Sequence, residues 1–208
     1  FREEPQHLKD IQEIIDQTLR CKKIVSELLE FSRQSVGKAS SFSLEELINK
    51  SLNLLINQAL FQDIMVKKVI KKDLPNMVGD MGQLQQVFTN LFINAADALA
   101  NVEREPEINI SVYEANKRLF IKFRDNGCGI EKKSLSYIFD PFFTTKEVGK
   151  GTGLGLAIVY GIIKNHGGYI LCQRAVGQGT EFKVYLPIAS SSEIEPKESL
   201  FDLSDLLK

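Results

Sequence analysis

Glycines crowd one short stretch of the sequence, GKGTGLGLAIVYG, which runs from Gly149 to Gly161. Its first glycines alternate with Lys, Thr and Leu, and an apolar run typical of a helix follows at once. Glycines that lead into a helix offer unpaired backbone N–H groups at the positive end of the helix dipole. Lys146 and Lys150 add positive charge nearby. The pattern favours binding of an anion such as phosphate, although a glycine-rich loop with incidental lysines would look the same.

Two familiar phosphate-binding motifs do not fit this stretch. A dinucleotide-binding GxGxxG would need a third glycine where the sequence has Leu154, Leu156 or Ile158. A Walker A loop would need a glycine at Thr144 and a Ser or Thr at Gly151. Any phosphate site here must therefore belong to a different framework.

A second candidate group lies upstream, in DMGQLQQVFTNLFINAADAL. Its polar residues recur at steps of three and four, which places them on one face of a helix: Gln83, Gln86, Asn90, Asn94 and Asp97. Two Asn side chains four residues apart can meet one small ligand, and an Asn carbonyl oxygen suits Mg²⁺ beside phosphate oxygens. The alternative is the solvated side of an amphipathic helix.

A third candidate is DNGCGI, which begins with Asp125 at the end of an expected strand. A carboxylate there can accept a hydrogen bond from an exocyclic amine. Gly127 and Gly129 would leave room for a flat ring. Taken alone, an Asp-x-Gly sequence indicates only a turn.

The elements that carry these groups follow from the spacing of apolar residues. Residues 6–35 contain no Gly or Pro and have apolar side chains every three or four positions, which predicts a long helix whose stripe needs a partner helix. A short hinge is expected at 37–41. A capping box formed by Ser43 and Glu46 would begin a helix that runs to about residue 60.

The rest of the chain is expected to alternate helices and hairpins. Further helices are predicted at 80–101, beginning at Asp80, and at 153–165, with a short helical piece at 134–138. Alternating segments predict strands at 64–70, 107–115, 118–125, 167–175 and 179–187. Segregated hairpins and helices predict an α+β sandwich with the helices on one face of the sheet.

Composition excludes several classes of function. A formal net charge of −1 gives no reason to expect nucleic-acid binding, and no apolar run is long enough to span a membrane. The three cysteines are widely spaced and odd in number, which suits a reducing, cytoplasmic setting. Because the chain begins at Phe1, we expect a fragment of a longer protein that is itself free or membrane-anchored.

The order of motifs resembles the ATP-binding domain of sensor histidine kinases, in the superfamily that includes gyrase-type ATPases. The matching segments are QLQQVFTNLFINAADAL, DNGCGI, IFDPFFTTK, GKGTGLGLAIV and GQGTEFKVYLP, and CKKIVSELLEFSR resembles the end of the kinase dimerisation hairpin. The resemblance implies a two-layer sandwich with three helices on one face of a mixed or antiparallel sheet, preceded by a long helix. It divides the chain into part of the hairpin at 1–36, the ATP-binding domain at 37–188 and a linker or tail at 189–208.

The resemblance also implies roles for individual residues toward ATP and Mg²⁺. Asn94 would coordinate Mg²⁺, and Asp125 would accept the adenine amino group with help from Thr180. Residues 139–152 would form a mobile lid, anchored by Phe139, Phe142 and Phe143. The other residues assigned to the nucleotide are Gly127, Gly129, Ile130, Phe143, Lys146, Lys150, Gly151, Thr152, Gly153, Leu154 and Gly155.

Asn90 and Lys146 are the expected catalytic residues. In the ATPase branch, the helix that carries Asn90 supplies a Glu as general base, and an amide cannot take up a proton near pH 7. Transfer of the γ-phosphoryl group is therefore favoured over hydrolysis, with Lys146 neutralising phosphate charge. Asp97 departs from the basic residue that many members carry.

The phosphate acceptor implied by the resemblance is a histidine of a dimerisation helix. His7 lacks the acidic and Pro residues that follow an acceptor, and His166 reads as a helix cap, so the acceptor is expected outside this sequence. The implied partners are that helix, a response regulator receiver domain and a second copy of the kinase. A hydrolysing ATPase, a protein serine kinase and a nucleotide-binding module without transfer activity are the alternatives.

Overall fold

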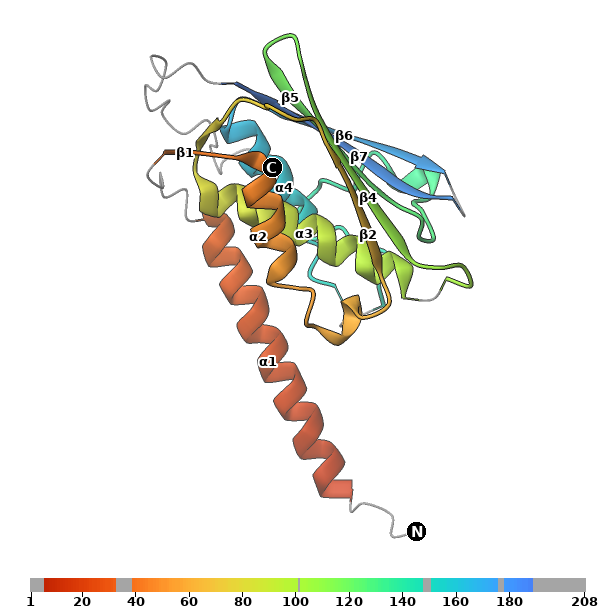
Figure 1. Ribbon diagram of the computed structural model, residues 1–208. Coiled ribbons are helices and arrows are strands. Elements are labelled where there is room, and N and C mark those ends of the chain that lie inside the picture. Colours follow the sequence, from red (N-terminus) through yellow and green to blue (C-terminus); the bar gives the residue numbers. More distant parts are fainter. Residues whose placement is uncertain (1–5, 33–38, 101, 148–150, 176–177, 189–208) are drawn as a thin grey trace.

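A computed structural model describes residues 6–32, 39–100, 102–147, 151–175 and 178–188 (Figure 1). Its centre is a five-stranded sheet of order β2-β4-β5-β7-β6. The first pair is parallel and the other three pairs are antiparallel, so the sheet is mixed as predicted. The strands are β2 (Met65–Ile70), β4 (Glu107–Ala115), β5 (Arg118–Asp125), β6 (Tyr169–Ala175) and β7 (Gly179–Pro187).

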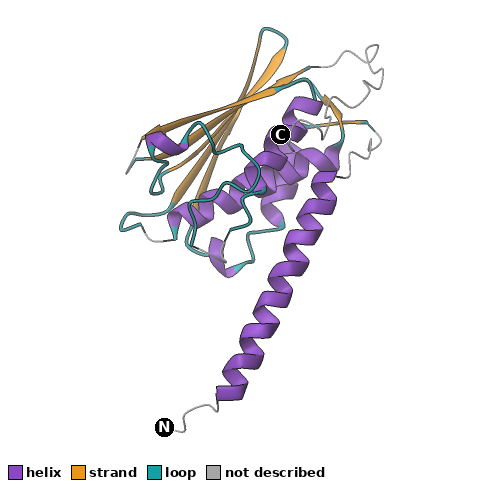
Figure 2. Ribbon diagram, turned by 180° about the vertical axis from the view of Figure 1, so that it is seen from behind, coloured by secondary structure: helices purple, strands orange, loops and turns teal. Residues whose placement is uncertain are grey.

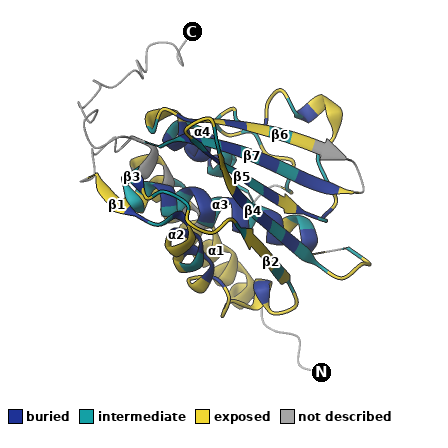
Figure 3. Cartoon of the chain, turned by 45° about the horizontal axis from the view of Figure 1, so that its top comes forward, coloured by how far each residue is buried: buried dark blue, intermediate teal, exposed yellow. Residues whose placement is uncertain are grey.

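Three helices cover one face of this sheet, which confirms the predicted α+β sandwich (Figure 1). They are α2 (Leu44–Asn53), α3 (Met81–Leu99) and α4 (Gly155–Asn165). Alternate residues of the strands turn toward the helices and are buried (Figure 3). The ring of Phe92 on α3 packs edge-on against Phe123 of β5, with centroids 5.0 Å apart. The apolar face of the sheet and those of the helices therefore form one core.

Helix α3 begins where the sequence predicts. The Asp80 carboxylate accepts hydrogen bonds from the N–H groups of Gly82 and Gln83, at 2.8 and 3.0 Å. This capping satisfies two of the N–H groups that the first turn of a helix leaves without partners.

Several element boundaries differ from the prediction. Helix α2 ends at Asn53 rather than near residue 60, and the following turns let Leu55 and Phe61 both enter the core. The Ser43 side chain makes no capping bond, so the predicted capping box is wrong; only the Ser43 carbonyl accepts a bond, from the N–H of Leu47. The 3₁₀ turn η1 (Ala59–Phe61) lies where the end of the helix was expected.

Short elements account for the other differences. Strands β1 (Ser40–Phe42) and β3 (Met77–Gly79) form a small antiparallel pair, partly within the expected hinge. Three-residue strands are too short to show periodicity in the sequence. The expected helical piece at 134–138 is instead the 3₁₀ turn η2 (Lys132–Ser134), and α4 begins at Gly155, two residues later than predicted.

Helix α1 (Gln6–Ser32) projects away from the sandwich (Figures 1 and 2). Its apolar stripe is open to solvent: Ile11, Ile14 and Leu19 are 50%, 66% and 58% exposed. A shallow concave surface follows this helix, bordered by side chains such as Glu13 and Cys21. The described part of the chain contains no helix that is both long and apolar enough to cross a bilayer.

Candidate functional site

Asp125 is a buried carboxylate at the end of β5, with only 3% of its surface exposed. Its Oδ1 accepts hydrogen bonds from the N–H groups of Gly127 at 2.9 Å and of Thr180, on the neighbouring strand β7, at 3.2 Å. Among the described residues, no donor reaches Oδ2. Burial raises the pKa of this carboxyl above its usual value, and the backbone N–H groups of Gly127, Thr180 and Asp125 itself, together with the charge of Arg124, act in the opposite direction. One oxygen is thus fixed by the backbone, and the other is left for a donor.

Two glycines make the close packing around Asp125 possible. Gly179 has φ +96°, and a Cβ there would lie 1.9 Å from the Asp125 carbonyl oxygen. A Cβ on Gly127 would lie 2.7 Å from the carbonyl oxygen of Ala98, which accepts a bond from the Cys128 N–H. Gly127 is therefore required for packing against α3, which fills the side where its Cβ would stand, and the space for a flat ring stays a prediction.

The polar face of α3 lies against the first turn of α4. The Asn90 Nδ2 donates to the Gly155 carbonyl oxygen at 3.3 Å. The Asn94 Nδ2 lies 3.9 Å from the position of a Cβ on Gly155. No residue that the structure describes forms a hydrogen bond with the Asn94 side chain, so its amide is available to a ligand.

The glycine-rich stretch leads into the first turn of α4 in a constrained backbone conformation. Gly153 has φ +72°, and a Cβ there would lie 2.3 Å from the carbonyl carbon of Phe142, which itself has φ +67°. The Thr152 Oγ1 accepts a hydrogen bond from the N–H of Leu154. The Leu154 side chain is buried in the core. A Cβ on Gly151 would lie 2.6 Å from a hydroxyl oxygen, the Oγ1 of Thr144. Gly149 and Lys150 lie outside the described residues.

The expected aromatic anchors of the lid divide into two groups. Phe139 packs on Tyr160 of α4 and Phe143 packs on Tyr137, with ring centroids 5.5 and 6.0 Å apart. Phe142 does not anchor the segment, because 61% of the residue is exposed to solvent. Its neighbours along the chain take the inward positions.

Lys146 forms an ion pair with Asp97, the residue that departs from the family pattern. This pair joins the segment after β5 to the polar face of α3 across 49 positions of sequence. The lysine expected to neutralise phosphate is therefore held at Asp97, one helical turn after Asn94 on the same helix. Sequence patterns gave no sign of this partner.

Two other predicted residues lie around the same loop. Gly129 has φ +76°, and Ile130 is partly buried against the core. Helix α3 thus brings together the predicted segments: Asn90 and Asn94 lie at Gly155, Asp97 pairs with Lys146, and Ala98 packs at Gly127, whose N–H donates to Asp125. Ala98 and Gly179 were missed as site residues, because each acts through close backbone contact rather than through a functional group.

A comparison with protein families supplies the identity. The profile described as "Histidine kinase-, DNA gyrase B-, and HSP90-like ATPase" matches residues 79–190, more than half of the chain. The chain belongs to this ATPase family. All described residues of the site lie within the matched range, from Asn90 to Thr180. The predicted resemblance to sensor histidine kinases is confirmed.

Relatives of this histidine kinase-like ATPase domain are sensor kinases. The chain is 38% identical to sensor kinase CckA of Brucella abortus over 190 residues, which cover 86% of the chain and 20% of CckA. It is 36% identical to sensor histidine kinase ZraS of Escherichia coli K12 over 169 residues, covering 81% of the chain and 35% of ZraS. The chain thus spans between a fifth and two fifths of these proteins.

A solved structure shows the same fold. Histidine kinase ThkA, crystallised in complex with the response regulator TrrA, superposes with a TM-score of 0.71 at 28% identity. The match covers 90% of this chain and 53% of ThkA. The similarity therefore includes parts of the chain outside the family profile.

Proposed function

We propose that this domain binds Mg-ATP and transfers its γ-phosphoryl group to a histidine of a kinase dimerisation helix. The observation that carries the proposal is the environment of Asp125. Its Oδ1 is saturated by backbone donors while its Oδ2, inside a buried setting, has no donor among the described residues. A buried carboxylate oxygen without a partner is costly. The adenine amino group would supply the missing donor, with Thr180 beside it.

Phosphate binding is proposed for the opposite end of the site. The first turn of α4 begins at Gly155 without a side-chain cap among the described residues, so its first N–H groups can serve an anion, and Gly151, Thr152 and Gly153 lead into it. Lys146 would exchange its contact with Asp97 for phosphate oxygens. The unpartnered Asn94 amide fits Mg²⁺, which usually takes few protein ligands together with substrate phosphates. The ion would add charge neutralisation when bound.

Transfer is favoured over hydrolysis by Asn90. Its amide donates to the Gly155 carbonyl oxygen, so it orients the first turn of α4 and offers no base to activate water. The relatives are named as sensor kinases, and ThkA was crystallised with a response regulator. We infer that the phosphorylated histidine passes its phosphoryl group to a receiver domain of such a regulator.

The domain division remains part of the proposal. Residues 1–36 would be the second half of a dimerisation hairpin, 37–188 the ATP-binding domain and 189–208 a linker or tail. The exposed stripe of α1 is the surface that a hairpin partner and a second copy would cover. The free thiols support a cytoplasmic setting.

The test is incubation with γ-labelled ATP and Mg²⁺, alone and with a separately supplied hairpin that carries an acceptor histidine. Acid-labile label on the added hairpin, and none on the chain itself, is the expected result. Acid-stable label would instead indicate a serine kinase. Release of free phosphate with no labelled protein would indicate an ATPase, and nucleotide binding with neither product would indicate a module without transfer activity.

A further inference from the structure

An aromatic row crosses the face of the sheet opposite the helices. It is formed by one residue from each of four adjacent strands: Tyr113, Phe120, Tyr185 and Tyr169. Successive ring centroids lie 5.3, 4.7 and 4.1 Å apart, so the rings are in continuous contact. Tyr113 and Tyr169, at its two ends, remain exposed. Aromatic rings in contact across an open sheet face form a large apolar surface.

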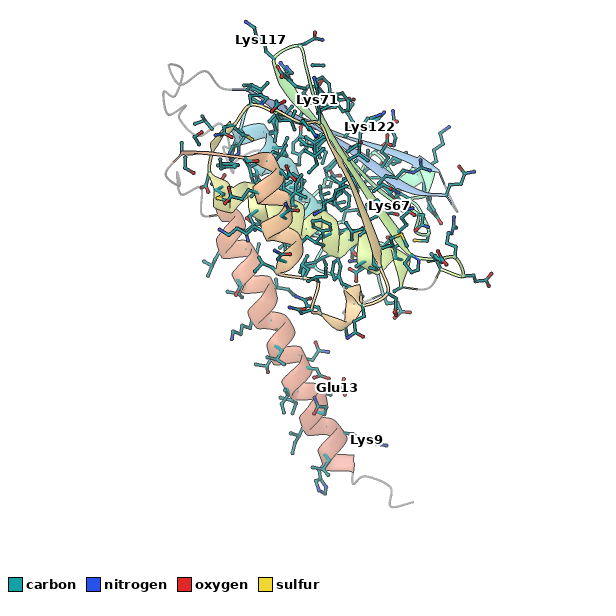
Figure 4. The ribbon with its side chains drawn as sticks, in the orientation of Figure 1. Lys9, Glu13, Lys67, Lys71, Lys117 and Lys122 are labelled. Carbon is teal, nitrogen blue, oxygen red and sulfur yellow. The ribbon has the colours of Figure 1, made fainter. Side chains whose placement is uncertain are left out.

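Cations surround this row. Arg118 lies 5.6 Å from the ring centroid of Tyr169, and the Lys122 ammonium lies 5.9 Å from that of Tyr113. In the part of the chain that the structure describes, neither cation forms a salt bridge. In Figure 4, Lys117 lies at the turn between β4 and β5, and Lys71 and Lys122 lie further along the sheet below it.

The carboxylates on the same face do not balance these cations. Glu107 pairs with Lys67, and Glu181 pairs with Lys183 at 3.4 Å. Both acids therefore have lysine partners of their own, away from the Arg118 end of the row. A segment that covers the row must combine negative charge with apolar side chains, because it would meet both unpaired cations and open rings.

Residues 189–208 of this chain have that composition. The segment ASSSEIEPKESLFDLSDLLK contains five carboxylates and two lysines, while the whole chain has a formal net charge of −1. The remainder of the chain is therefore net positive. The apolar residues of the segment are interleaved with its acids, as in Leu200, Phe201, Asp202 and Leu203.

The segment also begins next to the Arg118 end of the aromatic row. Strand β7 pairs Pro187 with Arg118, and the N–H of Ile188 donates to the Lys117 carbonyl oxygen at 3.2 Å. Residue 189 thus follows directly after the cationic end of the row. The row spans three strand spacings, roughly 15 Å, whereas 20 residues reach up to about 65 Å when extended.

We propose that residues 189–208 fold back in cis over the aromatic row and its cations. This inference is independent of the proposed function, since the surface lies on the opposite side of the sheet from α3 and α4. The apolar residues of the segment would cover the rings, and its carboxylates would pair with Arg118, Lys122 and Lys117.

The test places a nitroxide spin label on the segment of the full chain and measures its broadening of backbone amide signals by NMR. The label is attached to Ser204→Cys in a chain that also carries Cys21→Ser and Cys128→Ser. Cys172 is left in place, because burial raises the pKa of its thiol to about 12. We expect strong, concentration-independent loss of the Tyr113, Tyr169 and Leu171 signals, and none for helix α2.

Two variants and a mixing experiment make the result decisive. Lys122→Glu should weaken the broadening, whereas Lys9→Glu, the same charge change on helix α1, should not (Figure 4). The contact should also loosen in 1 M salt, where charges are screened within about 3 Å. If broadening appears only on an isotope-labelled chain mixed with a separate spin-labelled copy, the proposal is wrong and a second copy covers the face. No selective broadening in either sample would also overturn it.

Discussion

The neutral ring of His166 links the start of helix α3 to the end of helix α4. Its Nε2 accepts a hydrogen bond from the Asp80 N–H at 3.1 Å, and its Nδ1 lies 2.8 Å from the Ile162 carbonyl oxygen. The first contact needs an unprotonated Nε2 and the second needs a proton on Nδ1, so the ring must be the neutral Nδ1–H tautomer. Burial lowers the pKa of His166 in keeping with this arrangement. The predicted structural role is confirmed, with the start of α3 as an additional partner.

We therefore expect acid to destabilise the domain through His166. Because the folded-state pKa lies below the unfolded value of 6.5, the stabilisation is fully present above pH 6.5 and is lost as the pH falls through the folded pKa. Each unit of difference between the two pKa values corresponds to about 1.4 kcal/mol. Urea titrations at several pH values should show a steeper fall in the free energy of unfolding for the native chain than for His166→Gln. Equal slopes would contradict this role.

Cys128 offers a chemical test of the loop that is proposed to bind adenine. Its thiol is exposed, whereas burial raises the pKa of Cys172 to about 12, so an alkylating reagent near pH 8 should spare Cys172. In a Cys21→Ser chain, we expect iodoacetamide to abolish ATP binding. The matched Cys128→Ser chain should keep its affinity after the same treatment. Unchanged ATP affinity after complete modification of Cys128 would show that the loop is not at the nucleotide.

At the scale of elements, α3 organises the whole site. Asn90 contacts α4, Asp97 holds Lys146, and Ala98 accepts the Cys128 N–H at 3.1 Å. Three segments that are distant in the sequence therefore meet on one helix. The periodic polar stripe allowed this face to be predicted, because residues three and four apart lie together on a helix.

The glycines of the loop and of α4 should respond differently to the same substitution. Gly153→Ala places a Cβ 2.3 Å from the Phe142 carbonyl carbon at φ +72°, so we expect a loss of at least about 1–2 kcal/mol and weaker nucleotide binding. Gly161, in the interior of α4, has nothing within 4 Å of an added Cβ. Gly161→Ala should stabilise the chain by about 1 kcal/mol and raise Tm by about 2–4 °C. Thermal unfolding that ranks the two variants in the opposite order would contradict the described packing.

At the scale of the whole molecule, local patterns predicted the type and order of the main elements but not the contacts between them. The Asp80 cap and the alternation in β4 and β5 are local signals, and both predictions are confirmed. The bonds of Asp80 to His166 and of Asp125 to Thr180 join residues 86 and 55 positions apart. Such pairings arise from packing the helices on the sheet, so no short window contains them. The early end of α2 has the same origin, since tertiary burial of Leu55 and Phe61 overrides helix propensity.

The most direct test of the account is the affinity of the chain for ATP and GTP, measured by titration calorimetry with Mg²⁺ before and after Asp125→Asn. In the variant, the amide oxygen must stay at the Oδ1 position to accept the Gly127 and Thr180 N–H groups, so the NH₂ group replaces Oδ2. A donor would then face the adenine amino donor. Loss of a hydrogen bond to a charged group costs about 1.5–3 kcal/mol, which corresponds to at least about tenfold weaker ATP binding.

We predict that loss for ATP, together with a shift of preference toward GTP, whose ring carbonyl would suit the new donor. Asp16→Asn, on the exposed face of α1, is the control and should leave both affinities unchanged. Undiminished ATP binding by a folded Asp125→Asn chain would show that the nucleotide base does not bind at Asp125, and would contradict the account.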